Sequence, residues 1–322
     1  MIDSKTIVRI FYKMLKTRLF EEKLVMLKED GLISDRLCLS LGQEATAAAV
    51  CVLDKEDIIF ASHRANAVAI GADSDIQPLL AEYMGMKEGL CAGRSSGSSI
   101  ADNNVNIYGT SALYAGNFIT AVGAALSMKI QNKDNCVICF AGDGAASLGN
   151  FYEAVNMAAL YKLPVIFFIE NNCYAKNIRV DKVHNVADIA TRAQAFDIPG
   201  IITDGNNAID VYTAVKKALE YAKENASPVI VESKTYRIAG HTYNEEQYYR
   251  NQQEVMDWTG YDPIENLTAY MREHALGNMD DLMMMREKIQ QEVDVAAKAL
   301  TDELKPAENI DFTPEKEADE QK

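Results

Sequence analysis

The sequence predicts an α/β protein whose mostly parallel sheet is flanked by helices. Two apolar runs, residues 136–140 and 165–169, are too short for helices and rich in β-branched and aromatic residues. Between them, residues 150–161 carry apolar side chains at helical spacing. A strand–helix–strand unit of this kind has a right-handed crossover, so we expect its two strands to lie parallel in one sheet.

The other elements are predicted from the same periodicities. Residues 4–30 predict a long amphipathic helix that Ser4 can cap and that Gly31 follows. Further helices are predicted at 41–52, 121–129, 187–196, 208–224, 264–276 and 281–300, strands at 57–64 and 228–232, and loops at 93–102 and 177–186. We expect residues 1–305 to form one domain and 306–322 to form a charged, disordered tail.

Polar residues follow both strands of the central unit. Residues 142–144 (Gly-Asp-Gly) come after the first strand and residues 170–172 (Glu-Asn-Asn) after the second. Parallel strands bring these ends to the same edge of the sheet, where open α/β sheets bind ligands. Asp143 and Asn172 offer hard oxygens for Mg²⁺, which prefers few protein ligands and adds phosphate oxygens. The glycines allow close approach of a ligand, and free N–H groups where the next helix starts suit a diphosphate.

Composition excludes several classes of function. The chain has 322 residues, of which 48% are hydrophobic and 25% charged, and a net charge of −15. This acidic balance argues against a general nucleic-acid or anionic-membrane surface. The N-terminal stretch lacks the pattern of a signal peptide, and no apolar run is long enough to span a bilayer. We therefore expect a cytoplasmic protein that binds neither nucleic acid nor membrane.

The cysteines indicate packing rather than chemistry. Cys136 and Cys139 have CxxC spacing, but a redox pair would need an exposed turn or helix start, and a zinc site a second pair. Because the pair lies inside a predicted strand, where residues three apart point to opposite faces, we expect two small packing side chains. Six scattered, unpaired cysteines suit a reducing compartment.

The central unit resembles a known cofactor-binding motif. Its GDG followed by NN is similar to the thiamine-diphosphate motif, and the phrase GDGAASLGNFYEAVNMAALYKLPVIFFIENNCYA resembles the alpha subunit of the first component of 2-oxo acid dehydrogenases. That family includes the pyruvate, branched-chain 2-oxo acid and acetoin dehydrogenases, and the motif sequences are most similar to those of the acetoin type. The resemblance covers about residues 7–305. It implies the thiamine-diphosphate-binding fold with extra N- and C-terminal helices.

The resemblance also implies roles for single residues. His63-Arg64 matches a family element whose arginine contacts the cofactor diphosphate, a task suited to its fork of donors. Backbone groups of Ala112 and Tyr114 would hydrogen-bond the aminopyrimidine ring. His241, in the phrase TYRIAGH, falls on a family histidine at the mouth of the active site near the diphosphate. His63 and His241 are thus both cofactor-binding and catalytic candidates.

The implied metal ligands come from the central unit. They are the Asp143 carboxylate, the Asn172 side-chain oxygen and the Tyr174 backbone carbonyl, completed by phosphate oxygens and water. Gly144 and Ala145 would offer backbone N–H groups to the diphosphate. In this family the glutamate that activates the aminopyrimidine belongs to a beta subunit. The resemblance therefore implies thiamine diphosphate, Mg²⁺ and an assembly of two alpha and two beta chains.

Two family histidines are missing. Cys38 stands just before the GQEA phrase, and Ser99 stands in the Gly/Ser-rich loop at 93–102, where family members of this type carry histidines. Their loss removes groups suited to acid–base chemistry near neutral pH. Tyr114 is also bulkier than the usual Val or Leu.

Three functions therefore stay open. The first is a dehydrogenase alpha subunit, acting on acetoin, pyruvate or a branched 2-oxo acid, that cleaves a C–C bond next to a carbonyl and passes the acyl group to lipoyl of an acyltransferase partner. The second is a carboligase or decarboxylase alpha subunit without lipoyl transfer. The third is a binding-only subunit, against which the intact Asp143, Asn172, Arg64 and His241 argue.

Overall fold

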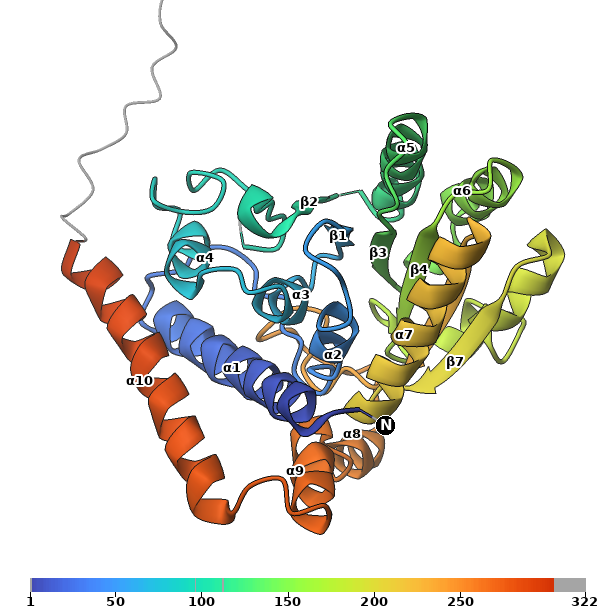
Figure 1. Cartoon of the computed structure of the whole chain (residues 1–322). Coiled ribbons are helices and arrows are strands. Elements are labelled where there is room, and N and C mark those ends of the chain that lie inside the picture. Colours follow the sequence, from blue (N-terminus) through green and yellow to red (C-terminus); the bar gives the residue numbers. More distant parts are fainter. Residues whose placement is uncertain (1, 96, 112, 304–322) are drawn as a thin grey trace, which may run out of the picture.

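A parallel sheet forms the centre of the protein. The computed structural model describes residues 2–95, 97–111 and 113–303. Among these residues, six strands form one sheet in the order β2-β1-β3-β4-β8-β7, with every pair parallel (Figure 1). The strands are β1 (Ile58–Ala61), β2 (Ile107–Thr110), β3 (Val137–Gly142), β4 (Val165–Asn171), β7 (Gly200–Asp204) and β8 (Val229–Lys234). The predicted α/β class is confirmed.

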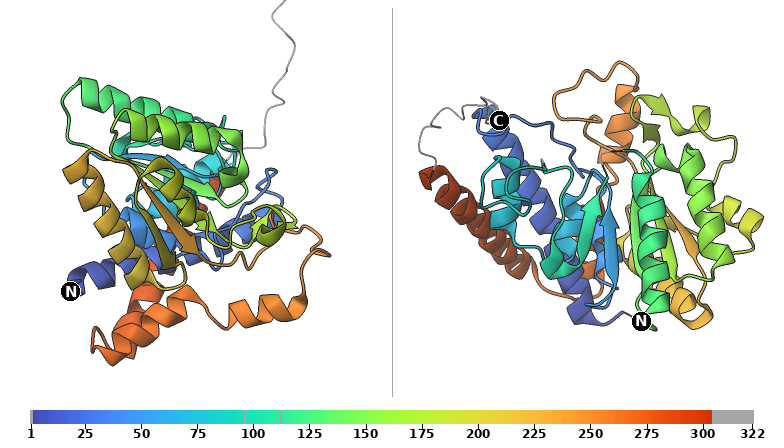
Figure 2. Two further views of the ribbon diagram at one scale, coloured as in Figure 1. Left: turned by 90° about the vertical axis from the view of Figure 1, so that its right-hand side faces the viewer. Right: turned by 90° about the horizontal axis from the view of Figure 1, so that it is seen from above.

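Helices cover both faces of the sheet. One face packs on α5 (Gly116–Ile130), α6 (Gly149–Leu160) and the 3₁₀ helix η4 (Ile189–Phe196). The other face packs on a second group of helices, which are α1 (Ser4–Glu29), α2 (Thr46–Val50), α3 (Asn66–Gly71), α4 (Ile76–Tyr83), α7 (Ala208–Asn225), α9 (Pro263–Glu273) and α10 (Met279–Glu303). Figure 2 shows α10 lying along α1 on one side and α5 beside α6 on the other.

Alternation along the strands divides the core in two. In β3, Ile138 and Phe140 face the core on the α1 side, whereas Val137 and Cys139 face the core on the α5 side. Cys136, just before β3, joins the α1 side, so the two cysteines of the CxxC pair lie on opposite faces as predicted. All six cysteines are free.

The N-terminal helix forms as predicted but is capped by a different residue. Ser4 is the first residue of α1, and the cap is Asp3, whose carboxylate accepts a hydrogen bond from the Thr6 N–H at 3.0 Å. An ionised carboxylate also interacts favourably with the positive end of the helix dipole, which a serine hydroxyl does not. Gly31 follows the helix with a φ of +78°, a conformation that glycine adopts without strain.

Several elements differ from the sequence prediction. Residues 187–196 contain the 3₁₀ helix η4 rather than an α-helix, and its start is fixed by Glu232, which accepts from the Ala190 N–H at 2.9 Å. The predicted loop at 177–186 contains a short strand, β6 (Ile178–Arg179), and a 3₁₀ turn, η3 (Val180–Lys182). β2, β7, α3, α4 and α8 (Gln252–Thr259) were not predicted.

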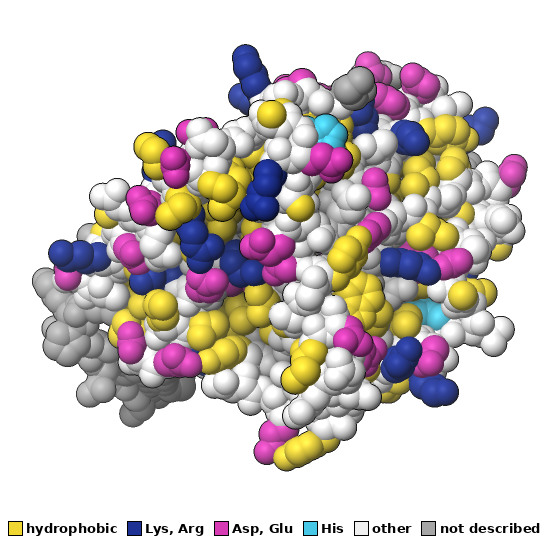
Figure 3. All heavy atoms as spheres, turned by 90° about the horizontal axis from the view of Figure 1, so that it is seen from below, with side chains coloured by type: hydrophobic (Ala, Val, Ile, Leu, Met, Phe, Trp, Pro, Cys, Tyr) yellow, Lys and Arg dark blue, Asp and Glu magenta, His cyan; other side chains and the backbone are white. Residues whose placement is uncertain are grey.

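Two further expectations concern the surface and the tail. Within the described ranges, no helix is long and apolar enough to cross a bilayer. Acidic and basic side chains are interspersed on the face shown in Figure 3. The tail expected at 306–322 lies outside the described residues.

Candidate active site

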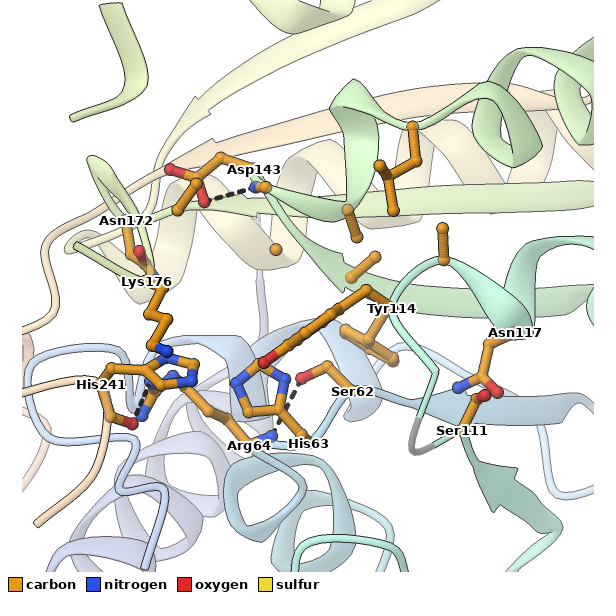
Figure 4. A pocket seen from close by; sticks show the side chains of 18 of the residues that line it. Ser62, His63, Arg64, Ser111, Tyr114, Asn117, Asp143, Asn172, Lys176 and His241 are labelled. Carbon is orange, nitrogen blue, oxygen red and sulfur yellow. Dashed lines mark hydrogen bonds between the residues drawn. The ribbon is translucent and has the colours of Figure 1, made fainter. Parts of the chain in front are cut away.

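A cavity of about 260 Å³ lies at the carboxyl edge of the sheet (Figure 4). The register between β3 and β4 runs from Val137↔Val165 to Gly142↔Glu170, so both strands end at the same level. The segments that follow β1, β3, β4 and β8 line the cavity together with the start of α5. This is the edge at which the sequence predicted a ligand site.

The cavity brings together the residues that the sequence singled out. Its lining includes His63, Arg64, Tyr114, Asp143, Gly144, Ala145, Asn172, Tyr174 and His241. Ala112, the remaining candidate, lies outside the described residues. The structure thus brings together residues from five separate segments of the chain, while their individual roles stay predictions.

Asp143 carries an oxygen that has no partner among the described residues. The side chain is buried, and Oδ1 accepts from the Gly144 N–H at 2.7 Å, whereas Oδ2 is buried without a hydrogen bond. Burial raises the pKa of Asp143 to about 6, against the Gly144 N–H and the charges of Arg237 and Arg64, which lower it. A buried carboxylate oxygen without a donor fits a bound cation.

Asn172 is oriented by the GQEA segment. Its Nδ2 donates to Oε1 of Gln43 at 2.8 Å, so the amide oxygen Oδ1 stays on the other side and accepts only a long bond of 3.4 Å from the Tyr174 N–H. The described residues contain no cluster of three or more His, Cys, Asp or Glu side chains suited to a metal ion. A metal here would therefore take further ligands from a bound phosphate, as Mg²⁺ does.

Tyr174 and Gly144 are two further cavity residues, with predicted roles in holding the metal and the diphosphate. The Tyr174 carbonyl accepts from Nη1 of Arg237 at 3.4 Å, a weak bond that leaves the oxygen accessible to another partner. A Cβ on Gly144 would lie 2.9 Å from the Cβ of Ala175, so only glycine allows this close approach. The Gly144 N–H, predicted to contact a diphosphate, donates to Asp143 in this structure.

Two buried guanidinium groups face the cavity without an anionic partner. Arg64 donates to the Leu39 carbonyl at 2.7 Å and the His241 carbonyl at 2.9 Å, and Arg237 donates to the Lys176 carbonyl at 2.5 Å. Neither has a described carboxylate within ion-pair distance. Burial and the charge of Arg64 lower the pKa of Arg237 to about 10. Two desolvated cations with neutral partners attract an anion strongly.

The two histidines lie next to each other and are neutral near pH 7. The ring centroids of His63 and His241 are 5.5 Å apart, and Tyr114 packs edge-on against His63 at 6.0 Å. Burial and the charge of Arg64 lower the pKa of His63 to about 3 and that of His241 to about 4. Nε2 of His63 is buried without a partner among the described residues. Both neutral rings can therefore accept a hydrogen bond from a bound ligand.

The positions of the two missing histidines do not reach the cavity wall. Neither Cys38 nor Ser99 belongs to the described residues that line the cavity. Cys38 is buried beside Leu39, and burial raises the pKa of its thiol although Arg64 and Arg237 act in the opposite direction. A buried thiol of raised pKa is a weak acid–base group, so the loss of histidine here is not compensated by Cys38.

Sequence reasoning missed two residues of the cavity lining, Arg237 and Lys176, and two that support it from outside, Gln43 and His184. Arg237 belongs to the TYRIAGH phrase and Gln43 to GQEA, so both lie inside recognised segments but carried no assigned role. Lys176 lines the cavity and had no sequence signal. His184 supports the site from outside the lining, with Nε2 2.9 Å from the Asp143 carbonyl.

The fold and the site define a class of protein. This is an α/β protein with a cavity at the carboxyl edge of a parallel sheet, and the buried guanidinium groups and the buried carboxylate at that cavity suit an anionic ligand.

Comparison with known proteins gives the family. The model of the dehydrogenase E1 component family matches residues 12–309. The chain is 35% identical over 249 residues to the alpha subunit of acetoin:2,6-dichlorophenolindophenol oxidoreductase from Bacillus subtilis, covering 77% of this chain and 75% of that one. It is 34% identical over 285 residues to the pyruvate dehydrogenase E1 component subunit alpha of Rickettsia bellii, covering 88% and 87%. The corresponding subunit of Porphyra purpurea is 31% identical over 281 residues, covering 85% and 82%. The chain belongs to the dehydrogenase E1 component family.

Membership confirms the resemblance found in the sequence. It confirms the E1 alpha-subunit family, the fold class and the prediction of a thiamine-diphosphate-dependent oxidoreductase subunit.

Proposed function

We propose that this chain is the alpha subunit of a thiamine-diphosphate-dependent dehydrogenase that acts on acetoin or a 2-oxo acid. The matched relatives are alpha subunits of an acetoin oxidoreductase and of pyruvate dehydrogenases. They favour the dehydrogenase over a carboligase or decarboxylase without acyl transfer. The binding-only alternative has no support from them.

One observation carries the proposal. A single cavity holds a buried, partnerless oxygen of Asp143 and two buried guanidinium groups without carboxylate partners among the described residues. A metal-bound diphosphate satisfies all three groups at once, because the metal takes the carboxylate oxygen and the phosphates take the guanidinium donors.

Different residues would hold different parts of the cofactor. Asp143, Asn172 and the Tyr174 carbonyl would hold Mg²⁺, and Arg64, with His63, Gly144, Ala145 and His241 around it, would hold the diphosphate. Ala112 and Tyr114 would contact the aminopyrimidine through backbone groups. Thiamine diphosphate, when bound, supplies the electron sink for cleavage of the C–C bond next to a carbonyl.

This chain's own contribution to the chemistry is positioning and proton transfer. His63 and His241 lie side by side, border the cavity and are neutral in this structure. The negative charge of a bound diphosphate would raise both pKa values toward neutrality, where either ring could hold or pass a proton at the reacting end of a substrate. The Arg64 guanidinium fixes the backbone of His241 through its bond to the His241 carbonyl. We propose both histidines as catalytic residues.

The proposal includes partners. An alpha subunit works with a beta subunit, and we propose an assembly of two alpha and two beta chains that passes the acyl group to lipoyl of an acyltransferase. Six free cysteines fit a reducing compartment, and we propose the cytoplasm.

The test is reconstitution with the beta partner. The chain is purified alone and with the beta subunit, and binding of thiamine diphosphate with and without Mg²⁺ is measured by isothermal titration calorimetry. Turnover is followed by reduction of free lipoamide with acetoin, pyruvate or a branched 2-oxo acid. We expect Mg²⁺-dependent binding and turnover in the complex, and no turnover by the chain alone.

A matched pair of variants tests the metal site. Asp143→Asn removes the partnerless carboxylate oxygen, and we expect cofactor affinity to fall by about a hundredfold or more. Asp134→Asn changes an exposed carboxylate outside the cavity and should bind the cofactor normally. Equal affinities for both variants, or carboligation without lipoyl acylation in the complex, would contradict the proposal.

A further inference from the structure

We propose that Lys176 binds the carboxylate of the substrate, so that this site takes a 2-oxo acid in preference to a neutral hydroxyketone. This inference rests on the proposed function and adds the substrate class to it.

Lys176 is placed at the cavity by a short hairpin. β5 (Tyr174–Ala175) pairs antiparallel with β6 (Ile178–Arg179), and Lys176 is the first residue of the turn between them. Figure 4 shows its side chain reaching from the hairpin toward His241. The ammonium charge is close enough to His241 to contribute to the lowered pKa of that ring, after burial and the charges of Arg64 and Arg237.

The backbone of Lys176 is held in an unfavourable conformation. Its φ is +58°, in the left-handed region that costs free energy for a residue with a Cβ. Its carbonyl accepts from Nη2 of the buried Arg237 at 2.5 Å, so the arginine that faces the cavity also fixes this turn. The strained turn directs a long cationic side chain into the site, which is where proteins retain backbone strain.

The two arginines of the cavity suffice to bind the cofactor diphosphate, so Lys176 is not needed for that role. Three cationic side chains, Arg64, Arg237 and Lys176, line the cavity against the single carboxylate of Asp143. The two guanidinium groups are buried and fixed by backbone carbonyls, which suits the fixed position of a diphosphate. Lys176 is exposed at the cavity, and no described carboxylate lies within ion-pair distance of it. Although the chain has a net charge of −15, the ammonium group of Lys176 is therefore able to bind a second anion besides the diphosphate.

The chemistry of lysine fits a ligand that arrives from solvent. Its ammonium is a compact charge on a flexible stem, able to meet a carboxylate that enters after the cofactor is in place. A 2-oxo acid carries such a carboxylate, whereas acetoin is neutral. The contact stabilises the charge of the ground-state substrate and gives the transition state no extra stabilisation, so it lowers KM without raising kcat.

The experiment compares three variants in the assembled alpha–beta enzyme. Lys176→Met removes the charge with similar length, Lys176→Arg keeps it, and Lys182→Met removes an exposed charge from η3 outside the cavity. KM and kcat are measured for pyruvate, a branched 2-oxo acid and acetoin. Calorimetry gives the affinity of each variant for thiamine diphosphate and for oxamate, an unreactive carboxylate isostere of pyruvate.

We expect Lys176→Met to raise KM for the 2-oxo acids about tenfold more than KM for acetoin, with the loss in KM rather than kcat, and to weaken oxamate binding by a similar factor. Lys176→Arg should recover most of the loss, and Lys182→Met should match the unchanged enzyme. Equal losses for acetoin and 2-oxo acids, or weaker thiamine diphosphate binding without weaker oxamate binding, overturn the inference. An enzyme that turns over acetoin alone overturns it and leaves the proposed function standing. An enzyme that binds the cofactor and turns over neither substrate overturns both.

Discussion

Unpaired polar atoms mark the site at the scale of single residues. Oδ2 of Asp143, Nε2 of His63 and Nε of Arg237 are each buried without a hydrogen-bond partner among the described residues. A buried group left without a partner costs about 1–3 kcal/mol. A ligand that supplies a cation and several oxygens would remove these costs together, so the free protein is destabilised at the place where binding is strongest.

Glu21 gives a stability prediction that is independent of the cofactor. It is buried in α1, both carboxylate oxygens accept from the Ser40 N–H at 2.7 and 2.8 Å, and Oε1 accepts from Asn66. Burial raises the pKa of Glu21 from its ordinary 4.5 to about 7, although these donors act in the opposite direction. Between those two values the folded protein binds more protons than the unfolded chain. The free energy of unfolding therefore falls as the pH rises through this window, by at most about 1.4 kcal/mol per pH unit from this residue.

Urea unfolding across this pH window checks the Glu21 prediction. Glu21→Gln should unfold with a flatter pH dependence than the natural chain, since the group that titrates is gone. Glu22→Gln, a change at the neighbouring, half-exposed residue of the same helix, should keep the natural slope. Identical slopes for all three proteins would show that Glu21 does not titrate between the folded and unfolded states.

Sequence reasoning found residues that follow a strand end, and residues to which the family resemblance assigns a role, such as Arg64 and His241, and it missed the others. Asp143 and Asn172 follow buried parallel strands, so their place at the sheet edge can be derived. Arg237 and Lys176 could not be distinguished by sequence from surface cations, because arginine and lysine are usually exposed. Only the tertiary packing buries Arg237 and directs the side chain of Lys176 into the cavity. The partners of Gln43 and His184, 129 and 41 residues away, are equally invisible to local patterns.

At the scale of elements, the predicted strands and helices differ in how well they matched. β3 and β4 were found within about two residues because they are continuous apolar runs, buried over almost their whole length. β7 is an edge strand with mixed burial, and α8 has no buried residue, so neither carries a clear apolar pattern. These two elements contribute little to the core and therefore leave little trace in the sequence.

The segment after α4 shows how an apparent loop acquires order. The sequence predicts a Gly/Ser-rich loop at 93–102. In the structure Glu82 accepts backbone N–H groups of Cys91, Gly93 and Ser95 at 2.7, 2.9 and 2.8 Å. One carboxylate from α4 thus fixes the start of this loop.

Replacing that carboxylate should loosen the loop. Glu82→Gln leaves one acceptor oxygen for three N–H groups, so we expect a loss of about 1–3 kcal/mol and faster amide exchange at Cys91, Gly93 and Ser95. Hydrogen–deuterium exchange measures the rates at these amides, and Glu88→Gln, an exposed change in the same segment, is the control. Unchanged exchange in Glu82→Gln would mean that the loop is held by other contacts.

At the scale of the whole molecule, the rim of the cavity is apolar and exposed. Leu113 is 77% exposed, Tyr114 59% and Leu148 42%, and all three line the cavity. Large, exposed apolar side chains gathered around a cavity are typical of a surface that another chain covers. The proposed beta subunit, which would complete the cofactor site, is the partner expected at this rim.

A charge placed on the rim should therefore block assembly. Leu148→Asp should prevent or strongly weaken the alpha–beta complex, because burial of an unpaired carboxylate in an interface is unfavourable, while the fold of the chain itself stays intact since Leu148 is already half exposed. Val295→Asp changes an equally apolar, 62% exposed residue on α10, on the opposite side of the molecule, and should assemble normally. Light scattering after gel filtration gives the mass of each complex, and thermal unfolding of each isolated chain checks its fold. A Leu148→Asp chain that forms the complex as readily as the natural one would place the beta subunit on another face and leave the exposed rim without an explanation.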